Sequence, residues 1–244
     1  MKRILLFIGL LLTFSNLAAQ KEITKNIKAS GINEVYVHAK FADKIEVKNW
    51  NKNEVSVQAT VNINDNKDNN SFSLKEDKIG ATYTIKSDYG DLFKKHKKGV
   101  TITHNGNGCN GYNHCTNHNE MKISYIIYAP KNMKLKIKSI SGSVDALTYY
   151  GKLSLDLISG NITVKKHSKN MNLKTISGDI DVVVSDAEFK AETLTGTVYS
   201  DLDIDFNKNR KKSYGGQKIY GTVKNGTASL KLKTISGDIF LRKI

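Results

Sequence analysis

The sequence predicts an all-β protein built as a β-solenoid, in which two-strand rungs of about 18 residues stack in parallel like those of a β-helix. Three observations lead to this prediction. The octapeptide LKTISGDI occurs at residues 173–180 and again at 232–239. Glycines at 142, 160, 178 and 196 recur every eighteen residues, and apolar residues alternate on both sides of each glycine. A fixed period indicates stacked units, and period-two alternation indicates half-buried strands.

Residues 1–19 have the composition of a secretory signal peptide. Lys2 and Arg3 precede the apolar run 4–12, and small residues follow up to Ala19, near which we expect cleavage. The apolar run is about half as long as a membrane-spanning helix needs, so it is interpreted as the h-region of a signal peptide. Lipid attachment would need a cysteine at the cleavage site, and both cysteines lie far downstream. We therefore expect an exported protein, periplasmic or extracellular, without a membrane span or anchor.

Residues 20–130 are expected to form an N-terminal β region. Apolar residues alternate in runs such as 35–41, 55–63 and 121–125, but the eighteen-residue period is absent. We expect irregular first rungs or a capping sheet that covers the end of the stack. A long loop is predicted at 88–119, and the only proline, Pro130, marks the joint to the repeats.

Residues 131–244 are expected to form the repeat β-solenoid region. Aligned on glycine, its units read SISGSV, LISGNI, TISGDI, TLTGTV, IYGTV and TISGDI, the last two at Gly221 and Gly237. An insertion at 205–217 lengthens the interval before Gly221. Two short strands flank each glycine, and the apolar positions switch there between odd and even residue numbers, which we call a change of parity. Such a switch predicts a sharp corner, which glycine can form because it adopts positive φ.

Stacking in chain order predicts two interior columns. One would contain Ile140, Ile158, Ile176 and Leu194, and the other Val144, Ile162, Ile180 and Val198. On this interpretation the octapeptide repeats because every rung faces the same neighbours. An acidic residue in place of Ile176 would then leave a charge in the core.

Lysines dominate the outward positions on the first strand of each rung. They are Lys134, Lys136, Lys138, Lys152, Lys174, Lys190, Lys231 and Lys233, against Asp156, Glu188 and Glu192. Further basic residues are Lys94, Lys95, Lys97, Lys98 and the segment 209–212. Two interpretations of this lysine-rich face remain open. The lysines could only protect a flat sheet from edge-to-edge aggregation, or they could bind a polyanion.

The net charge of the chain limits which classes of partner are expected. The formal net charge is +15, of which the signal peptide accounts only for Lys2 and Arg3. Basic surfaces attract anionic partners with an affinity that depends on salt. For an exported chain we expect anionic polysaccharide or an envelope surface, and we do not expect nucleic acid.

The loop HNGNGCNGYNHCTNHNE at 104–120 contains the two cysteines. In an oxidising compartment, Cys109 and Cys115 are expected to form a disulfide that closes a glycine-rich loop. The alternative is a zinc or copper site formed by the same two cysteines with His104, His114 and His118, but the spacing lacks a paired C-x2-C motif. We predict no metal site and no cofactor.

An enzyme that cleaves polysaccharide is the alternative function, because elongated parallel β folds can carry such sites. It would need carboxylates that converge across neighbouring rungs. The position after the glycine reads Ser143, Asn161, Asp179, Thr197, Thr222 and Asp238, so its two carboxylates are expected on separated rungs. No Ser-His-Asp order, phosphate loop or HExxH motif is present, and the period does not fit a calcium-binding β-roll. We therefore predict no catalytic residues.

Several motifs resemble a known family. They are the ISGSV- and ISGDI-type rungs, GINEVYVHAKFADKIEVKNWNKNEV at 31–55, YAPKNMKLKIKSISG at 128–142 and NGTASLKLKTISGDIFLRK at 225–243. The chain thereby resembles exported bacterial proteins of unknown function with β-strand repeats that are named "putative adhesins", and more distantly the GIN-domain heads of autotransporter adhesins. The resemblance implies a solenoid-like β fold and an envelope or surface location, and it offers no established catalytic residues to carry over; residues 104–120 depart from it. We expect a non-enzymatic binding or structural module of the cell envelope.

Overall fold

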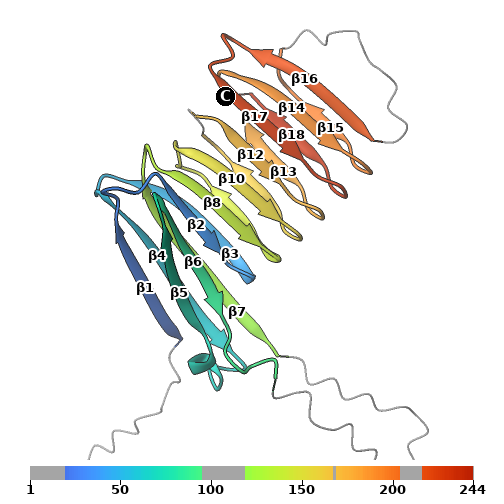
Figure 1. The fold of residues 1–244 in the computed structure, drawn as a ribbon. Coiled ribbons are helices and arrows are strands. Elements are labelled where there is room, and N and C mark those ends of the chain that lie inside the picture. The colour runs from blue at the N-terminus through green and yellow to red at the C-terminus, as the bar shows by residue number, and fades with distance from the viewer. Residues whose placement is uncertain (1–19, 95–118, 167–168, 204–215, 244) are drawn as a thin grey trace, which may run out of the picture.

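The computed structural model describes residues 20–94, 119–166, 169–203 and 216–243, and over these residues the protein is all-β apart from a short 3-10 turn at Asn69–Ser71 (Figure 1). The described residues form two nine-stranded sheets in which parallel pairs predominate. Sheet A consists, in spatial order, of β1 (Lys21–Lys28), β4 (Glu54–Ile63), β7 (Met121–Pro130), β3 (Phe41–Trp50), β9 (Ser141–Ala146), β11 (Ile162–Val164), β13 (Ile180–Val183), β18 (Ile239–Arg242) and β15 (Val198–Ser200). Sheet B consists of β16 (Gln217–Val223), β14 (Ala187–Thr193), β17 (Ala228–Lys233), β12 (Met171–Lys174), β10 (Lys152–Leu157), β8 (Lys134–Ser139), β2 (Glu34–His38), β6 (Thr82–Asp88) and β5 (Ser73–Ile79).

Each repeat unit supplies one strand to sheet B and, after its glycine turn, the next strand to sheet A. Thus β8 leads into β9, β10 into β11 and β12 into β13, and the units stack in parallel and in register. Leu155 lies opposite Leu173 in sheet B, and Ile162 lies opposite Ile180 in sheet A. The inward side chains of both sheets form one contiguous core, as the alternation predicts.

The spatial order of the units departs from the chain order. The pair β17–β18 lies between β12–β13 on one side and β14–β15 on the other. The two copies of LKTISGDI are therefore neighbours, with Leu173 opposite Leu232 and Ile180 opposite Ile239. The expectation of stacking in chain order is wrong from Ile180 onward, because units with the same turn and the same inward residues fit the same strand edge.

The turn within each unit requires glycine for two reasons. Gly178 has a φ of +144°, which side-chain-bearing residues rarely adopt. A Cβ at Gly178 would also lie 2.2 Å from the carbonyl oxygen of Gly160 in the neighbouring unit. Gly237 approaches Gly178 in the same way. Any side chain here would push the units apart, which explains the fixed glycine spacing.

A hydroxyl residue points inward three places before most turn glycines. Thr175 and Thr234 are buried, and their Oγ1 atoms donate hydrogen bonds to the carbonyl oxygens of Gly160 and Gly178 at 3.1 and 3.0 Å. A buried carbonyl without a partner is costly, so these bonds stabilise the inward position of threonine. The residue that follows the threonine then points outward.

The expected interior column of Ile140, Ile158, Ile176 and Leu194 is therefore wrong. Ile158, Ile176 and Leu194 are 44%, 40% and 54% exposed, and Ile140 is half-buried. The change of parity does occur, but it spans the whole turn, so the next inward residue after Thr175 is Ile180. The members of the second expected column are buried as predicted, namely Val144, Ile162, Ile180 and Val198, but Ile239 lies between the last two.

Gly221 is not a turn glycine. It lies within β16, which runs antiparallel to β14 and places Gly221 opposite Phe189. The segment IYGTV is thus an edge strand of sheet B and not a rung of the stack. The expected insertion at 205–217 falls mainly on residues outside the described ranges.

The N-terminal region adds one more two-strand unit and a set of antiparallel strands. β2 pairs in parallel with β8, and β3 pairs in parallel with β9, so this unit continues the stack. β4 runs antiparallel to both β1 and β7, and β5 runs antiparallel to β6. The aromatic rings of Phe72 and Tyr89 pack edge to face within the core at this end. The N-terminal region thus consists of one further two-strand unit and of antiparallel strands that extend both sheets.

Candidate polyanion-binding face

The outward side chains of sheet B form three rows across the strands, which we call the lysine face. The row nearest the glycine turns consists of Lys86, His38, Lys138, Asp156, Lys174, Lys233, Glu192 and Lys218. The middle row consists of Tyr36, Lys136, Ser154, Asn172, Lys231, Lys190 and Tyr220. The third row contains Glu34, Lys134 and Lys152. The structure thus brings the eight outward lysines of the sequence analysis onto one face: Lys134, Lys136, Lys138, Lys152, Lys174, Lys190, Lys231 and Lys233.

Some of these lysines have acidic partners. The Nζ atom of Lys134 lies 2.5 Å from Glu34 Oε2, and that of Lys174 lies 3.8 Å from Asp156 Oδ1. Lys190 and Lys218 share Glu192, at 2.8 and 2.9 Å. Such exposed pairs contribute little to stability, but they reduce the positive charge that a ligand would meet.

The remaining lysines are the electrostatic feature of the face. Within the described ranges, no ion pair is formed by Lys136, Lys138, Lys152, Lys231 or Lys233. Lys138 is half-buried and the other four are exposed. Neighbouring strands of a sheet lie about 4.8 Å apart, and these lysines form two clusters, one on β8 and β10 and one on β17.

His38 lies among three lysines at one end of the face. Lys86 and Lys138 are its direct neighbours on β6 and β8, and Lys40 follows on the same chain segment. Partial burial lowers the pKa of His38, and the positive charges of Lys40, Lys138 and Lys86 lower it further. The imidazole is therefore neutral near pH 7.

An aromatic platform accompanies this cluster. The rings of Tyr36 and His38 are stacked, with centroids 6.1 Å apart and an interplanar angle of 12°. Lys136 Nζ lies 5.1 Å from the centroid of the Tyr36 ring. The sequence prediction missed Tyr36, His38 and Lys86, because the eighteen-residue period does not reach the N-terminal region. The alternation of Val35 and Val37 does place Tyr36 and His38 outward, so part of the signal was present.

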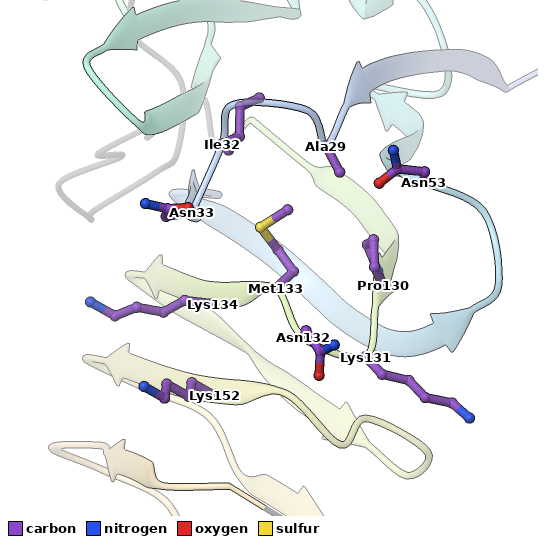
Figure 2. A pocket seen from close by; sticks show the side chains of 10 residues that line it. All are labelled: Ala29, Ile32, Asn33, Asn53, Pro130, Lys131, Asn132, Met133, Lys134 and Lys152. Atoms are coloured by element: carbon purple, nitrogen blue, oxygen red, sulfur yellow. The ribbon is translucent and has the colours of Figure 1, made fainter.

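A groove opens at the end of the third row (Figure 2). Its volume is about 510 Å³, and it is lined by Ala29, Ile32, Asn33, Asn53, Pro130, Lys131, Asn132, Met133, Lys134 and Lys152. Lys134 and Lys152 extend side by side from β8 and β10, while Lys131 points away from them (Figure 2). The lining contains lysines and asparagine amides but no carboxylate, so it offers cations and hydrogen-bonding groups to a ligand.

The two carboxylates that follow the turn glycines are neighbours, contrary to the expectation that other rungs separate them. The N–H of Asp238 donates to Oδ1 of Asp179 at 2.8 Å, because β18 lies next to β13. Oδ1 of Asp238 accepts the N–H of Thr197 at 2.8 Å, and Asn161 Oδ1 accepts the N–H of Asp179 at 2.9 Å. These side chains satisfy backbone groups at successive turns, which gives them a structural role.

Several sequence predictions fall outside the described ranges. They concern the signal peptide at 1–19, Cys109 and Cys115, the histidines at 104, 114 and 118, and the basic residues at 95–98 and 209–212. Over the ranges that are described, no cluster of three or more His, Cys, Asp or Glu side chains could hold a metal ion. The same ranges contain no helix of the length and apolarity needed to cross a membrane.

Comparison with known proteins confirms the family resemblance. Residues 116–242, about half of the chain, match the family model of Toastrack DUF4097. A crystal structure of a "putative cell adhesion protein" from Clostridium sporogenes has a TM-score of 0.61 at 12% identity, covering 92% of this chain and 100% of that chain. "Putative adhesins" from Bacteroides fragilis and Parabacteroides distasonis have TM-scores of 0.30 and 0.25 at 10% and 11% identity, covering 93% and 92% of this chain and 99% and 97% of theirs. The Clostridium sporogenes structure shows that the fold is shared, and nothing beyond the fold. No protein with a curated description matches the sequence.

Proposed function

We propose that the chain, which belongs to the Toastrack DUF4097 family, is an exported, non-enzymatic β-solenoid that binds anionic polysaccharide of the cell envelope through its lysine face. The observation that carries this proposal is the set of exposed lysines without ion pairs on sheet B. A cation that already contacts a carboxylate has little attraction left for a ligand. Lys136, Lys231 and Lys233 have no such carboxylate in the described ranges.

The separation of these lysines into two clusters favours a polymer over a small ligand. Lys231 and Lys233 lie on β17, and Lys136 and Lys138 lie on β8, with β10 and β12 between the two strands. An extended chain with repeated carboxylate or sulfate groups can follow both clusters at once. Binding through several weak contacts gives an affinity that falls steeply with salt, because each contact is a screened Coulomb attraction.

Two further observations support a saccharide as the polymer. The Tyr36–His38 platform offers a flat ring surface beside the cations, on which the apolar face of a sugar can lie. The groove of Figure 2 adds asparagine amides and Lys152 at the adjoining row. A polysaccharide-cleaving enzyme would need a pair of acids about 5 to 10 Å apart in such a groove, and the lining residues include none.

The test compares two variants with the same loss of charge. Lys138→Gln, Lys231→Gln and Lys233→Gln remove three lysines from the lysine face. The control changes Lys28, Lys67 and Lys166 to Gln, which are exposed, lie off this face and form no described ion pair. Retention on immobilised heparin, a model sulfated polysaccharide, is measured as the salt concentration at which each folded protein elutes.

We expect the face variant to elute at clearly lower salt than wild type and the control close to wild type. Equal shifts of the two variants would show that net charge, and not the face, determines retention. Failure of the wild-type protein to bind at about 50 mM salt, where screening is weak, would refute polysaccharide binding by this face.

A further inference from the structure

The outward residues at the glycine turns form a continuous row that we call the aliphatic ladder. In spatial order it consists of Ile140, Ile158, Ile176, Ile235 and Leu194. Backbone hydrogen bonds join successive members: the N–H of Ser159 donates to Ile140 O, that of Ser177 to Ile158 O, and that of Thr195 to Ile235 O, at 2.9 to 3.0 Å. The turns line up along one edge of the stack, so the ladder runs along that edge (Figure 1).

The exposure of this row is unusual for the molecule. Ile235, Ile176, Ile158 and Leu194 are 37%, 40%, 44% and 54% exposed, whereas the aliphatic residues inside the same units are buried. A single exposed aliphatic side chain needs no explanation, but a contiguous row does. The fold does not require these residues, because the turns are already held by the glycines, the threonine hydroxyls and the backbone bonds. A solvated turn could carry a polar residue at this position, as the first unit does with Lys40.

Charged residues accompany the ladder on one side. Two places before each ladder residue lies the first row of the lysine face, with Lys138, Lys174 and Lys233 next to Ile140, Ile176 and Ile235. Asp156 and Glu192 are the acids of this row, and both already contact lysines. On the other side lie small hydroxyl residues such as Ser159 and Ser177. The edge therefore presents a narrow apolar row that is bordered on one side by three lysines and two acids.

We propose that the aliphatic ladder docks on an anionic lipid surface. Aliphatic side chains would enter the headgroup region, and the neighbouring lysines would contact lipid phosphates, the combination by which basic amphipathic elements bind membranes. A second copy of the chain fits less well, since apposed ladders would bring two rows of lysines together. A row one residue wide also buries less area than a stable protein interface needs. The inference goes beyond polysaccharide binding and does not depend on it.

The experiment is co-sedimentation with vesicles at about 50 mM salt. Vesicles of phosphatidylglycerol mixed with phosphatidylcholine are compared with vesicles of phosphatidylcholine alone. The ladder variant carries Ile158→Ser and Ile176→Ser. Its matched control carries Ile79→Ser and Leu147→Ser, which are exposed aliphatic residues away from the ladder. Heparin retention of each variant reports that the lysine face and the fold are intact.

We expect the wild type and the control to bind the anionic vesicles, and the ladder variant to bind them at least about tenfold more weakly with unchanged heparin retention. Equal vesicle binding by the ladder variant and wild type, or no vesicle binding by wild type, would overturn the proposal. A wild type that dimerises in sedimentation velocity, with a monomeric ladder variant, would assign the ladder to a second copy instead. A wild type that binds anionic vesicles but not heparin would refute the proposed function and leave the lipid proposal intact.

Discussion

The outer faces of sheets A and B are built on the same parallel stack but carry their charges differently. On sheet A, Glu46 contacts Lys44 and Lys48 at 3.1 and 2.7 Å, and Asp181 contacts Lys165 and Arg242 at 3.4 and 2.7 Å. Each of these four cations therefore contacts an acid on the same side of the molecule. On sheet B, Lys136 and Lys138 of β8 and Lys231 and Lys233 of β17 form no ion pair in the described ranges.

The difference shows that a count of lysines does not identify a binding face. Both sheets carry basic residues at outward positions, and both would look basic in a list of residues. What distinguishes them is which cations contact an acid: on sheet B, Lys138 and Lys233 lie opposite Asp156 and Glu192 on neighbouring strands, yet form no ion pair in the described ranges. Net charge therefore bears on solubility, whereas the capacity to attract an anionic ligand depends on which cations lack an ion pair.

The largest expected effect is a loss of stability, caused by a core substitution that disrupts both sheets together. Ile180 is buried between the sheets, so Ile180→Asp would leave a carboxylate in the core and should lower the free energy of unfolding by about 4 kcal/mol. Ile176→Asp changes an exposed ladder residue four positions earlier and should cost less than about 1 kcal/mol. Urea unfolding of both variants measures the difference. Similar losses of stability would contradict the outward position of the ladder.

An intermediate effect should come from giving sheet B the charge pattern of sheet A. Ser154→Glu and Asn172→Glu would place acids in the middle row between Lys136 and Lys231. We expect roughly tenfold weaker binding to heparin, because the new carboxylates pair with the free lysines and repel the polyanion.

The matched control for this change adds the same charge to sheet A. Ser124→Glu and Thr163→Glu lie at outward positions of β7 and β11, away from the lysine face. Heparin binding should weaken by less than about twofold. An equal loss in the two double variants would mean that the two faces are electrostatically equivalent for a ligand.

The smallest effect should come from the protonation of His38. Its pKa lies below the usual histidine value, so the imidazole is neutral at pH 7 and gains its proton only at more acidic pH. The added charge joins Lys86, Lys138 and Lys40, so affinity for heparin should rise about twofold as pH falls from about 7.5 to 5.5. The groups that face His38 from its own strand and its neighbours are Tyr36, Lys40, Lys86 and Lys138.

The comparison for this pH dependence is the variant His38→Gln. Its affinity should change less with pH than that of the wild type, because glutamine cannot take up a proton. Isothermal titration at several pH values measures both proteins. Identical pH profiles would show that other histidines, at positions outside the described ranges, account for any change.

Much of the repeat architecture could be predicted because its causes are local. The alternation of Leu153 and Leu155 fixes which side chains of a strand point inward, and a glycine is needed wherever the backbone has positive φ and touches the next unit. The same alternation placed the lysines of β8, β12 and β17 outward. The aliphatic ladder was wrongly predicted to point inward, because the apolar alternation does not say at which residue of the turn the inward positions shift. The hydrogen bonds of the threonine hydroxyls decide that, since they hold the threonine inward and the next residue outward.

By itself, the sequence determined the all-β class, the two-strand unit, the glycine turns and the outward lysines, since each depends on residues a few positions apart. Only the tertiary structure decided the order of the units, the addition of Tyr36 and His38 to the lysine face, and the contact of Asp179 with Asp238. The physical reason is that the strand edges of similar units are nearly equivalent partners. Which of them meet depends on the packing of the whole stack, where β17–β18 fits between two units that precede it in the chain.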